Sequence, residues 1–219
     1  MKNKLIIFDL DGTLLNTIGD LAIGCDHMLA MRGLKGHTYE EYCSFVGNGI
    51  MRLVERALPE ELRTEEYVKA ARKDVVDYYI EHIDQKSHPY DGMPELLDTL
   101  QARGAKLAVA SNKFQAGTEK LIRKFFPEID FVEICGNREG VPLKPDTALV
   151  DFILEKANVE RDRVAMVGDS GVDIQTARGA GITSIGVSWG FRSRQELEEN
   201  RADYIVSSAE ELLNVLERY

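Results

Sequence analysis

Short runs of apolar residues, many of them β-branched, recur along the chain between glycines and aspartates. Runs of this length and composition are typical of strands that are buried on both faces of a sheet. They predict six strands, at 4–10, 106–110, 131–134, 163–167, 184–187 and 204–206.

Helix-length segments alternate with the later strands. The first of them has a proline near its start and Gly104 just past its end, which is typical of helix boundaries. We expect helices over 94–103, 116–126, 146–157, 172–178 and 209–218. Alternating strands and helices form parallel βαβ units. The pattern therefore predicts an α/β fold, a doubly wound parallel sheet with helices on both faces.

One connection is far longer than a crossover helix requires, because residues 12–104 separate the first two predicted strands. Inside it, apolar residues recur at helical spacing around 18–29, 50–58 and 67–79. We predict a helical cap domain over 15–87, inserted into an α/β core domain formed by 1–14 and 88–219. The connections around 13–17 and 85–92 would be hinges for a lid.

The composition is that of an acidic globular protein. The 219 residues are 44% hydrophobic, and 27 Lys+Arg against 37 Asp+Glu give a net charge of −10. The basic residues form no stripe, which argues against a nucleic-acid partner. No apolar run is long enough for a signal peptide or a membrane span. Three widely spaced cysteines indicate neither a disulfide framework nor a zinc site, so we expect a cytoplasmic protein without a membrane partner.

Polar residues that could act in catalysis or metal binding follow the predicted strands. In chain order they are Asp9, Asp11, Ser111, Lys144, Asp169 and Asp173. Ligands of open parallel sheets bind outside the carboxyl ends of the strands, so these side chains should share one crevice. Carboxylates that lie so close together need a cation to remain ionised. An all-oxygen set of ligands indicates Mg²⁺.

This set of residues favours chemistry on a phosphate. A carboxylate such as Asp9 is a nucleophile that needs no base, and aspartyl-phosphate is an established type of intermediate. Its attack on an anion requires Mg²⁺ and Lys144 to neutralise the phosphoryl oxygens, with the Ser111 hydroxyl and loop amides as further donors. Asp11, two residues on, can exchange a proton with the leaving alkoxide. Gly12 lets the backbone approach the phosphate closely.

These motifs resemble those of the haloacid dehalogenase superfamily of phosphohydrolases, in particular its phosphoglycolate phosphatase-like branch with a helical cap after the first strand. The segment 9–13 has the pattern of the first motif, and the other motifs follow in the family's order. The resemblance implies that Asp9 is the nucleophile and Asp11 the general acid and then the base. It implies that Ser111 and Lys144 bind the phosphate.

The same resemblance implies a metal site and a substrate. Mg²⁺ would be held by the carboxylates of Asp9 and Asp169 and the main-chain carbonyl of Asp11, with Asp173 in or next to its shell. The similarity extends to the cap segment 46–49, and cap segments of this kind choose the leaving group. We expect 2-phosphoglycolate as the substrate. The expected substrate-binding residues are Gly12, Thr13, Asn48, Arg52, Asn112 and Lys113.

Ordinary structural roles compete with these interpretations. Strand-end aspartates are common in turns, and Asp169 and Asp173 could cap the helix that follows them. Ser111 could also be a helix cap, and residues 47–49 could be a plain helix start. Trp189 could back the site or simply pack. The tyrosines of the third cap stretch lie on its apolar stripe, which favours core packing.

Other functions remain open at this point. A phospho-receiver signalling domain also places acidic residues and a lysine at strand ends, but it lacks the second carboxylate Asp11 and the long helical insert. Sugar phosphomutases, inorganic pyrophosphatases and sugar or nucleotide phosphatases share the same core machinery, so likeness of fold does not rank them. A dehalogenase is disfavoured, because Asp11 would have no task in displacing halide. The expected partner is a small phosphorylated metabolite, and the expected state a monomer or homodimer.

Overall fold

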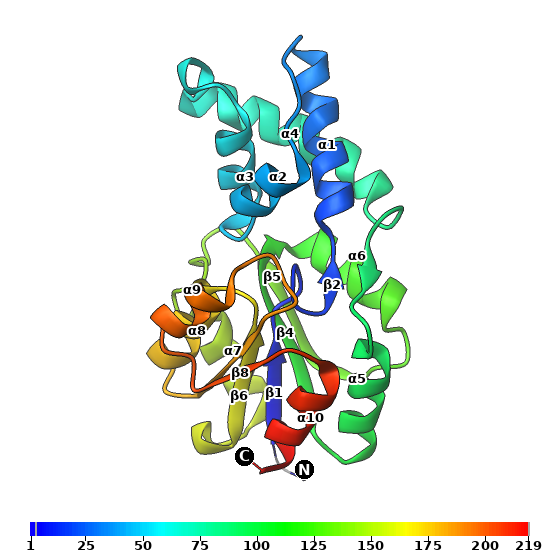
Figure 1. The fold of residues 1–219 in the computed structure, drawn as a ribbon, viewed down its shortest axis with the longest axis vertical. Helices are drawn as coiled ribbons and strands as arrows, with labels where there is room; N and C mark the ends of the chain where they lie inside the picture. The colour runs from blue at the N-terminus through cyan, green and yellow to red at the C-terminus, as the bar shows by residue number, and fades with distance from the viewer. Residues whose placement is uncertain (3, 219) are drawn as a thin grey trace.

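A six-stranded sheet forms the centre of the molecule in the computed structural model, which describes residues 1–2 and 4–218 (Figure 1). All neighbouring strands pair in parallel, in the order β5-β4-β1-β6-β7-β8. The strands are β1 (Leu5–Phe8), β4 (Lys106–Phe114), β5 (Phe131–Asn137), β6 (Val164–Gly168), β7 (Thr183–Val187) and β8 (Tyr204–Val206). The predicted parallel α/β sheet is confirmed.

Helices cover both faces of this sheet. The first face carries α5 (Met93–Ala102), α6 (Gln115–Phe125) and α10 (Ala209–Arg218), and the second carries α7 (Ala148–Ala157) and α8 (Gly171–Gly179). The alternation of side chains along β1 explains the two layers, since Ile6 and Phe8 pack into one cluster and Leu5 and Ile7 into the other. Burial of each such side chain contributes about 1.5–3 kcal/mol. A short helix, α9 (Arg194–Glu199), follows β7.

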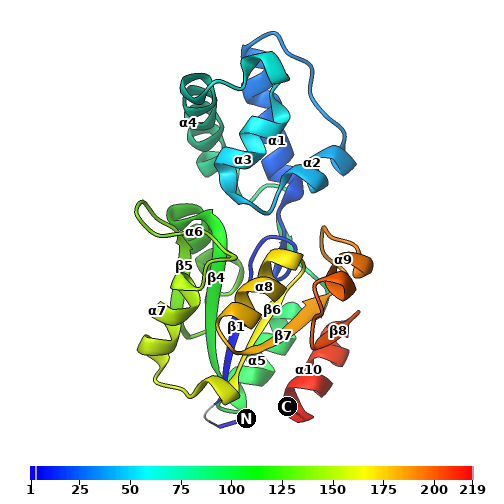
Figure 2. The same cartoon turned by 90° about the vertical axis from the view of Figure 1, so that its left-hand side faces the viewer.

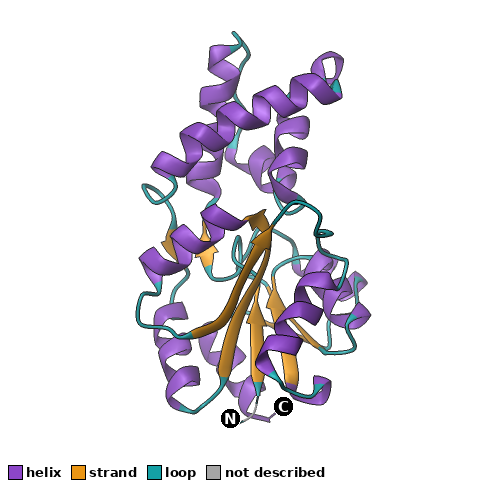
Figure 3. Ribbon diagram, turned by 180° about the vertical axis from the view of Figure 1, so that it is seen from behind, coloured by secondary structure: helices purple, strands orange, loops and turns teal. Residues whose placement is uncertain are grey.

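Residues 18–82 of the long connection between β1 and β4 form a group of helices above the sheet (Figure 2). These are α1 (Ile18–Met31), α2 (Tyr39–Phe45), α3 (Gly49–Ala57) and α4 (Glu65–His82), with the 3-10 turn η1 (Glu60–Leu62) before α4. Outside this group, a second 3-10 turn, η2 (Arg161–Arg163), precedes β6. All strands of the large sheet point toward this group, and both termini lie at the opposite end (Figure 3). The carboxyl ends of the strands therefore face the insert.

The two connections of the insert to the sheet lie side by side. They pair as short antiparallel strands, β2 (Leu15–Asn16) and β3 (His88–Pro89). The buried carboxylate of Asp20 in α1 accepts hydrogen bonds from the backbone N–H of Lys86, and from both the N–H and the hydroxyl of Ser87 at 2.7 Å. These contacts join the two predicted hinges. Among residues 1–2 and 4–218, no helix is both long and apolar enough to cross a membrane.

Candidate active site

Asp9 follows β1 at the centre of the sheet, where its N–H continues the ladder to Val167 of β6 at 2.9 Å. The buried Lys144 Nζ lies 2.9 Å from Asp9 Oδ1, close enough for an ion pair although the two atoms are not aligned for a hydrogen bond. Lys144 Nζ also donates to Asp173 Oδ1 and to the carbonyl of Ala110, each at 2.7 Å. The lysine therefore places its charge between two buried carboxylates.

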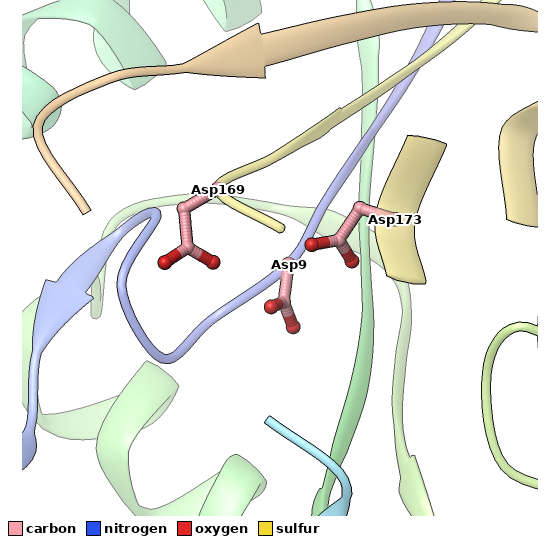
Figure 4. Close-up of side chains that lie close together, drawn as sticks. All are labelled: Asp9, Asp169 and Asp173. Atoms are coloured by element: carbon pink, nitrogen blue, oxygen red, sulfur yellow. The ribbon is translucent and has the colours of Figure 1, made fainter. Parts of the chain in front are cut away.

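The side chains of three aspartates lie close together at this site (Figure 4). Asp9, Asp169 and Asp173 each offer an oxygen, and these oxygens lie within 4.8 Å of one another. Asp169 follows β6, and its Oδ2 accepts the N–H of Phe191 at 2.7 Å. Asp173 is the third residue of α8, and its Oδ2 accepts the N–H and hydroxyl of Ser170. Asp173 thus caps its helix and faces the site at the same time.

Burial and mutual repulsion shift the pKa values of these groups. Burial raises the pKa of Asp9 to about 7, against the opposing effect of Lys144, and the charges of Asp173 and Asp11 add to the rise. Burial also raises the pKa of Asp169 well above its usual range, with Asp173 and Asp9 adding to it. Burial lowers the pKa of Lys144, but Asp173 and Asp9 outweigh this effect, so the net shift is upward.

The charge balance of the cluster fits a bound divalent cation. The ammonium of Lys144 stands beside three buried carboxylates, and burial together with mutual repulsion raises the pKa values of Asp9 and Asp169 despite this positive charge. A divalent cation would supply the missing charge. Carboxylate oxygens are the ligands that hard cations such as Mg²⁺ prefer.

Asp11 has a different set of partners. Its Oδ1 accepts hydrogen bonds from the Thr17 hydroxyl at 2.7 Å and from Lys113 Nζ at 3.0 Å, and its Oδ2 lies 3.3 Å from the same Nζ. Lys113 Nζ also donates to the hydroxyl of Tyr79 at 2.7 Å. Lys113 was expected beside the substrate; the structure places its ammonium on Asp11, although the residue also lines the cavity described below.

Ser111 and Asn112 lie in the irregular end of β4, where the pairing with β5 shifts in register. Ser111 is buried, and its Oγ accepts the N–H of Lys113 at 3.3 Å. The Asn112 side chain accepts the N–H of Lys144 at 2.8 Å and donates to the carbonyls of Lys144 and Gly47. We expected Asn112 to bind substrate. In the structure its side chain links the backbone of Lys144 to the loop at residues 46–49 of the insert.

The backbone N–H groups of the turn after β1 donate hydrogen bonds to carbonyls of the same turn. Gly12 N donates to Leu15 O at 2.9 Å, and Thr13 N donates to Leu10 O at 3.2 Å. Trp189 Nε1 donates to Thr13 O at 3.1 Å, so this tryptophan backs the turn. Gly12 and Thr13 thus stand next to the carboxylates, but their N–H groups are committed within the turn rather than available to a substrate.

A cavity of about 40 Å³ lies between the sheet edge and the insert. On the core side it is lined by Asp9, Asp11, Ser111, Lys113 and Asp169, and on the insert side by Leu21, Val46, Ile50 and Leu53. Asn48 and Arg52, also expected beside the substrate, line a second groove together with Arg56, Arg63 and Lys144. Neither Asn48 nor Arg52 lines the cavity that contains Asp9, but their groove reaches the lysine that pairs with Asp9.

Several residues of the site escaped the sequence analysis. Thr17 and Tyr79 contact the Asp11–Lys113 pair, and Phe191 orients Asp169. Arg192 lines the cavity and donates to the carbonyls of two cap residues. Thr17, Phe191 and Arg192 lie outside any motif, and the spacing of Tyr79 is that of a core residue.

One family model and many known proteins match this chain. The model of the haloacid dehalogenase-like hydrolases matches residues 6–187. The phosphoglycolate phosphatase of Vibrio parahaemolyticus is 31% identical over 218 residues, 97% of this chain and 96% of that protein. That of Agrobacterium fabrum is 37% identical over 194 residues, 86% and 82% of the two chains. A crystal structure from Lactobacillus delbrueckii subsp. bulgaricus, provisionally assigned as a phosphoglycolate phosphatase, has a TM-score of 0.91 at 32% identity and covers 99% of both chains.

Proposed function

Since this chain belongs to the haloacid dehalogenase-like hydrolases and is a phosphatase, we propose that it hydrolyses a small phosphate monoester with Mg²⁺ through a phosphoryl intermediate on Asp9. The observation that carries the proposal is the placement of Asp9 at the central strand end, 2.9 Å from Lys144 and beside two further buried carboxylates. Membership of this family decides against the phospho-receiver alternative.

The proposed reaction has two steps. In the first, an oxygen of Asp9 attacks phosphorus and the bond to the leaving oxygen breaks, while Asp11 donates a proton to the departing alkoxide. In the second, Asp11, now a carboxylate, removes a proton from the water that attacks the aspartyl-phosphate, which releases inorganic phosphate and restores both Asp9 and the protonated Asp11. Lys144 reduces the repulsion between the nucleophile and the phosphate. When bound by Asp9, Asp169 and Asp173, Mg²⁺ would supply charge neutralisation at the phosphoryl oxygens.

The proposed substrate is 2-phosphoglycolate. Arg192 on the cavity wall adds positive charge that favours an anionic substrate. The relatives named phosphoglycolate phosphatase, at 31% and 37% identity, support the same choice.

A hydrolysis panel tests both parts of this proposal. The wild-type protein would be assayed with 2-phosphoglycolate, pyrophosphate, sugar phosphates and nucleoside monophosphates, with Mg²⁺ and with EDTA. We expect 2-phosphoglycolate among the best substrates by kcat/KM, and activity that EDTA removes and Mg²⁺ restores. A poor rate on 2-phosphoglycolate would leave the phosphatase class but remove this substrate, and full activity in EDTA would overturn the metal requirement.

Arg52 gives a separate check on the position of the substrate. Arg52 lines the groove that also contains Asn48 and Arg56, called the outer groove below, and it pairs with Glu55. Arg52→Ala should therefore leave KM for 2-phosphoglycolate within about twofold of wild type. A several-fold rise in KM would return Arg52 to the substrate site, where the sequence analysis had placed it.

A further inference from the structure

A buried lysine connects the insert to the proton-transfer group of the proposed reaction. Lys113 of β4 has a side chain that is only 3% exposed, and its ammonium contacts Asp11 on one side and Tyr79 of α4 on the other. The three residues come from three separate parts of the chain: the loop after β1, the end of β4 and the last helix of the insert.

The geometry satisfies the ammonium completely. An ammonium has three N–H donors, and Lys113 Nζ has three acceptors: Asp11 Oδ1 at 3.0 Å, Asp11 Oδ2 at 3.3 Å and the Tyr79 hydroxyl at 2.7 Å. The same Nζ lies 4.7 Å from the centre of the Tyr79 ring. A buried ammonium that loses one acceptor is left with an unpaired donor, which favours a different orientation.

We propose that Tyr79 is a positioning residue for catalysis, which through Lys113 holds the side-chain carboxyl group of Asp11 in the orientation for proton transfer to the leaving group. This inference rests on the proposed function and goes beyond it, because it assigns a task to an insert residue that touches neither phosphate nor metal ligand in the proposed reaction. It also gives Lys113 a role other than direct recognition of the substrate.

The Tyr79 ring and its hydroxyl have separable roles. The ring is fully buried, packs against Gly24 of α1 and lies edge to face with Phe114 at 6.2 Å between centroids. The hydroxyl reaches past this packing to Lys113. Tyr79→Phe therefore keeps the ring in the core and removes only the acceptor.

The test compares two esters that differ in their need for a proton. The alkoxide that leaves 2-phosphoglycolate must be protonated, whereas 4-nitrophenolate leaves 4-nitrophenyl phosphate readily without a proton. Since kcat/KM reports the first step, Tyr79→Phe should lower kcat/KM for 2-phosphoglycolate about tenfold or more and that for 4-nitrophenyl phosphate by less than about threefold. Tyr78→Phe is the matched control, because the Tyr78 ring stacks on His27 and His82 instead.

A double-mutant comparison tests whether Tyr79 acts through Lys113. If it does, Tyr79→Phe combined with Lys113→Met should be no slower on 2-phosphoglycolate than Lys113→Met alone, whereas independent effects would multiply. Equal losses on both esters in Tyr79→Phe, or multiplied losses in the double variant, would overturn the inference and leave Tyr79 a packing residue. Absence of turnover by the wild type on either ester would instead overturn the proposed function, and this inference with it.

Discussion

The side chain of Asp169 lies between Gly12 and Gly190, and neither glycine has room for a side chain of its own. A Cβ at Gly12 or at Gly190 would overlap atoms of the Asp169 side chain, and Gly12 has a φ of 88°, in the left-handed region. Phe191, next in the chain to Gly190, donates its N–H to the same carboxylate. The carboxylate is therefore fixed by packing and by a hydrogen bond from the backbone, as a preorganised site requires.

Gly12→Ala should damage the site more than the fold. The left-handed backbone costs an alanine about 1–2 kcal/mol of stability, and the overlap with Asp169 should lower kcat by about 100-fold. Gly181→Ala is the control, because Gly181 has a φ of 65° but no atom within 4 Å of the added Cβ. It should show a similar loss in urea unfolding and an unchanged kcat. A wild-type kcat in Gly12→Ala would contradict this account of Asp169.

At the level of single residues, the sequence best predicts the positions of polar residues that directly follow a strand. A polar residue directly after a buried strand must lie at the carboxyl end of the sheet, and the structure brings Asp9 and Asp169 together there. The position of Arg52 could not be predicted in this way. Helix α3 presents Ile50 to the cavity and Arg52 to the outer groove. Which face of an inserted helix meets the sheet depends on tertiary packing that the motif does not encode.

At the scale of elements, two side chains outside the insert, Arg192 and Asn112, hold the loop 46–49 and the end of α2. The Arg192 guanidinium donates to the carbonyl of Cys43 at 2.5 Å and also to that of Val46, at the end of α2 where helical carbonyls lack partners. Asn112 donates to the carbonyl of Gly47. Because Val46 and Gly47 line the cavity, these bonds set the shape of its insert side.

Arg192→Ala should loosen this loop without unfolding the sheet. Amide hydrogen exchange of residues 43–49 should become faster, and KM for 2-phosphoglycolate should rise about three- to tenfold because the insert side of the cavity is no longer fixed. Arg194→Ala serves as the comparison, since Arg194 is exposed and pairs with Glu198 in its own helix. Unchanged exchange in Arg192→Ala would show that the loop is held in some other way.

The elements that the sequence did not predict are short, namely β2, β3, α2, α9 and the two 3-10 turns. β2 and β3 have two residues each, too short for a pattern, and they pair only because the insert brings its two ends together. β4 continues to Phe114, although the sequence predicted an end at Ala110, because the irregular pairing with β5 accommodates the polar residues 111–113. The long strands and helices with buried faces were predicted to within a few residues.

For the whole molecule, the net charge of −10 understates the repulsion inside the site. The pKa of Asp9 is about 7 in the folded protein against an ordinary value of 3.8, and the pKa of Asp169 is also raised. A carboxyl group whose pKa is higher in the folded state stabilises the fold below the unfolded pKa, and this contribution is lost as the pH rises from about 4 to about 7. The metal-free protein should therefore lose this stabilisation over that range.

Mg²⁺ should reverse this loss. Because the cation binds ionised carboxylates and competes with protons, the rise in Tm on adding Mg²⁺ should be larger at about pH 8 than at about pH 5. Differential scanning calorimetry in EDTA and in Mg²⁺ measures the effect, and Asp169→Asn should remove most of it. An equal or larger rise at the lower pH would mean that Mg²⁺ does not bind this cluster.

The central claim is that Asp9 carries the phosphoryl group during turnover. Wild-type protein quenched in acid while hydrolysing 2-phosphoglycolate, reduced with borohydride and digested, can be analysed by mass spectrometry, because borohydride converts an acyl phosphate into an alcohol. The account predicts homoserine at position 9 in the quenched wild-type protein, and neither homoserine nor turnover above background in Asp9→Asn. A reduced carboxyl group at another position, or turnover by Asp9→Asn at the wild-type rate, would contradict it.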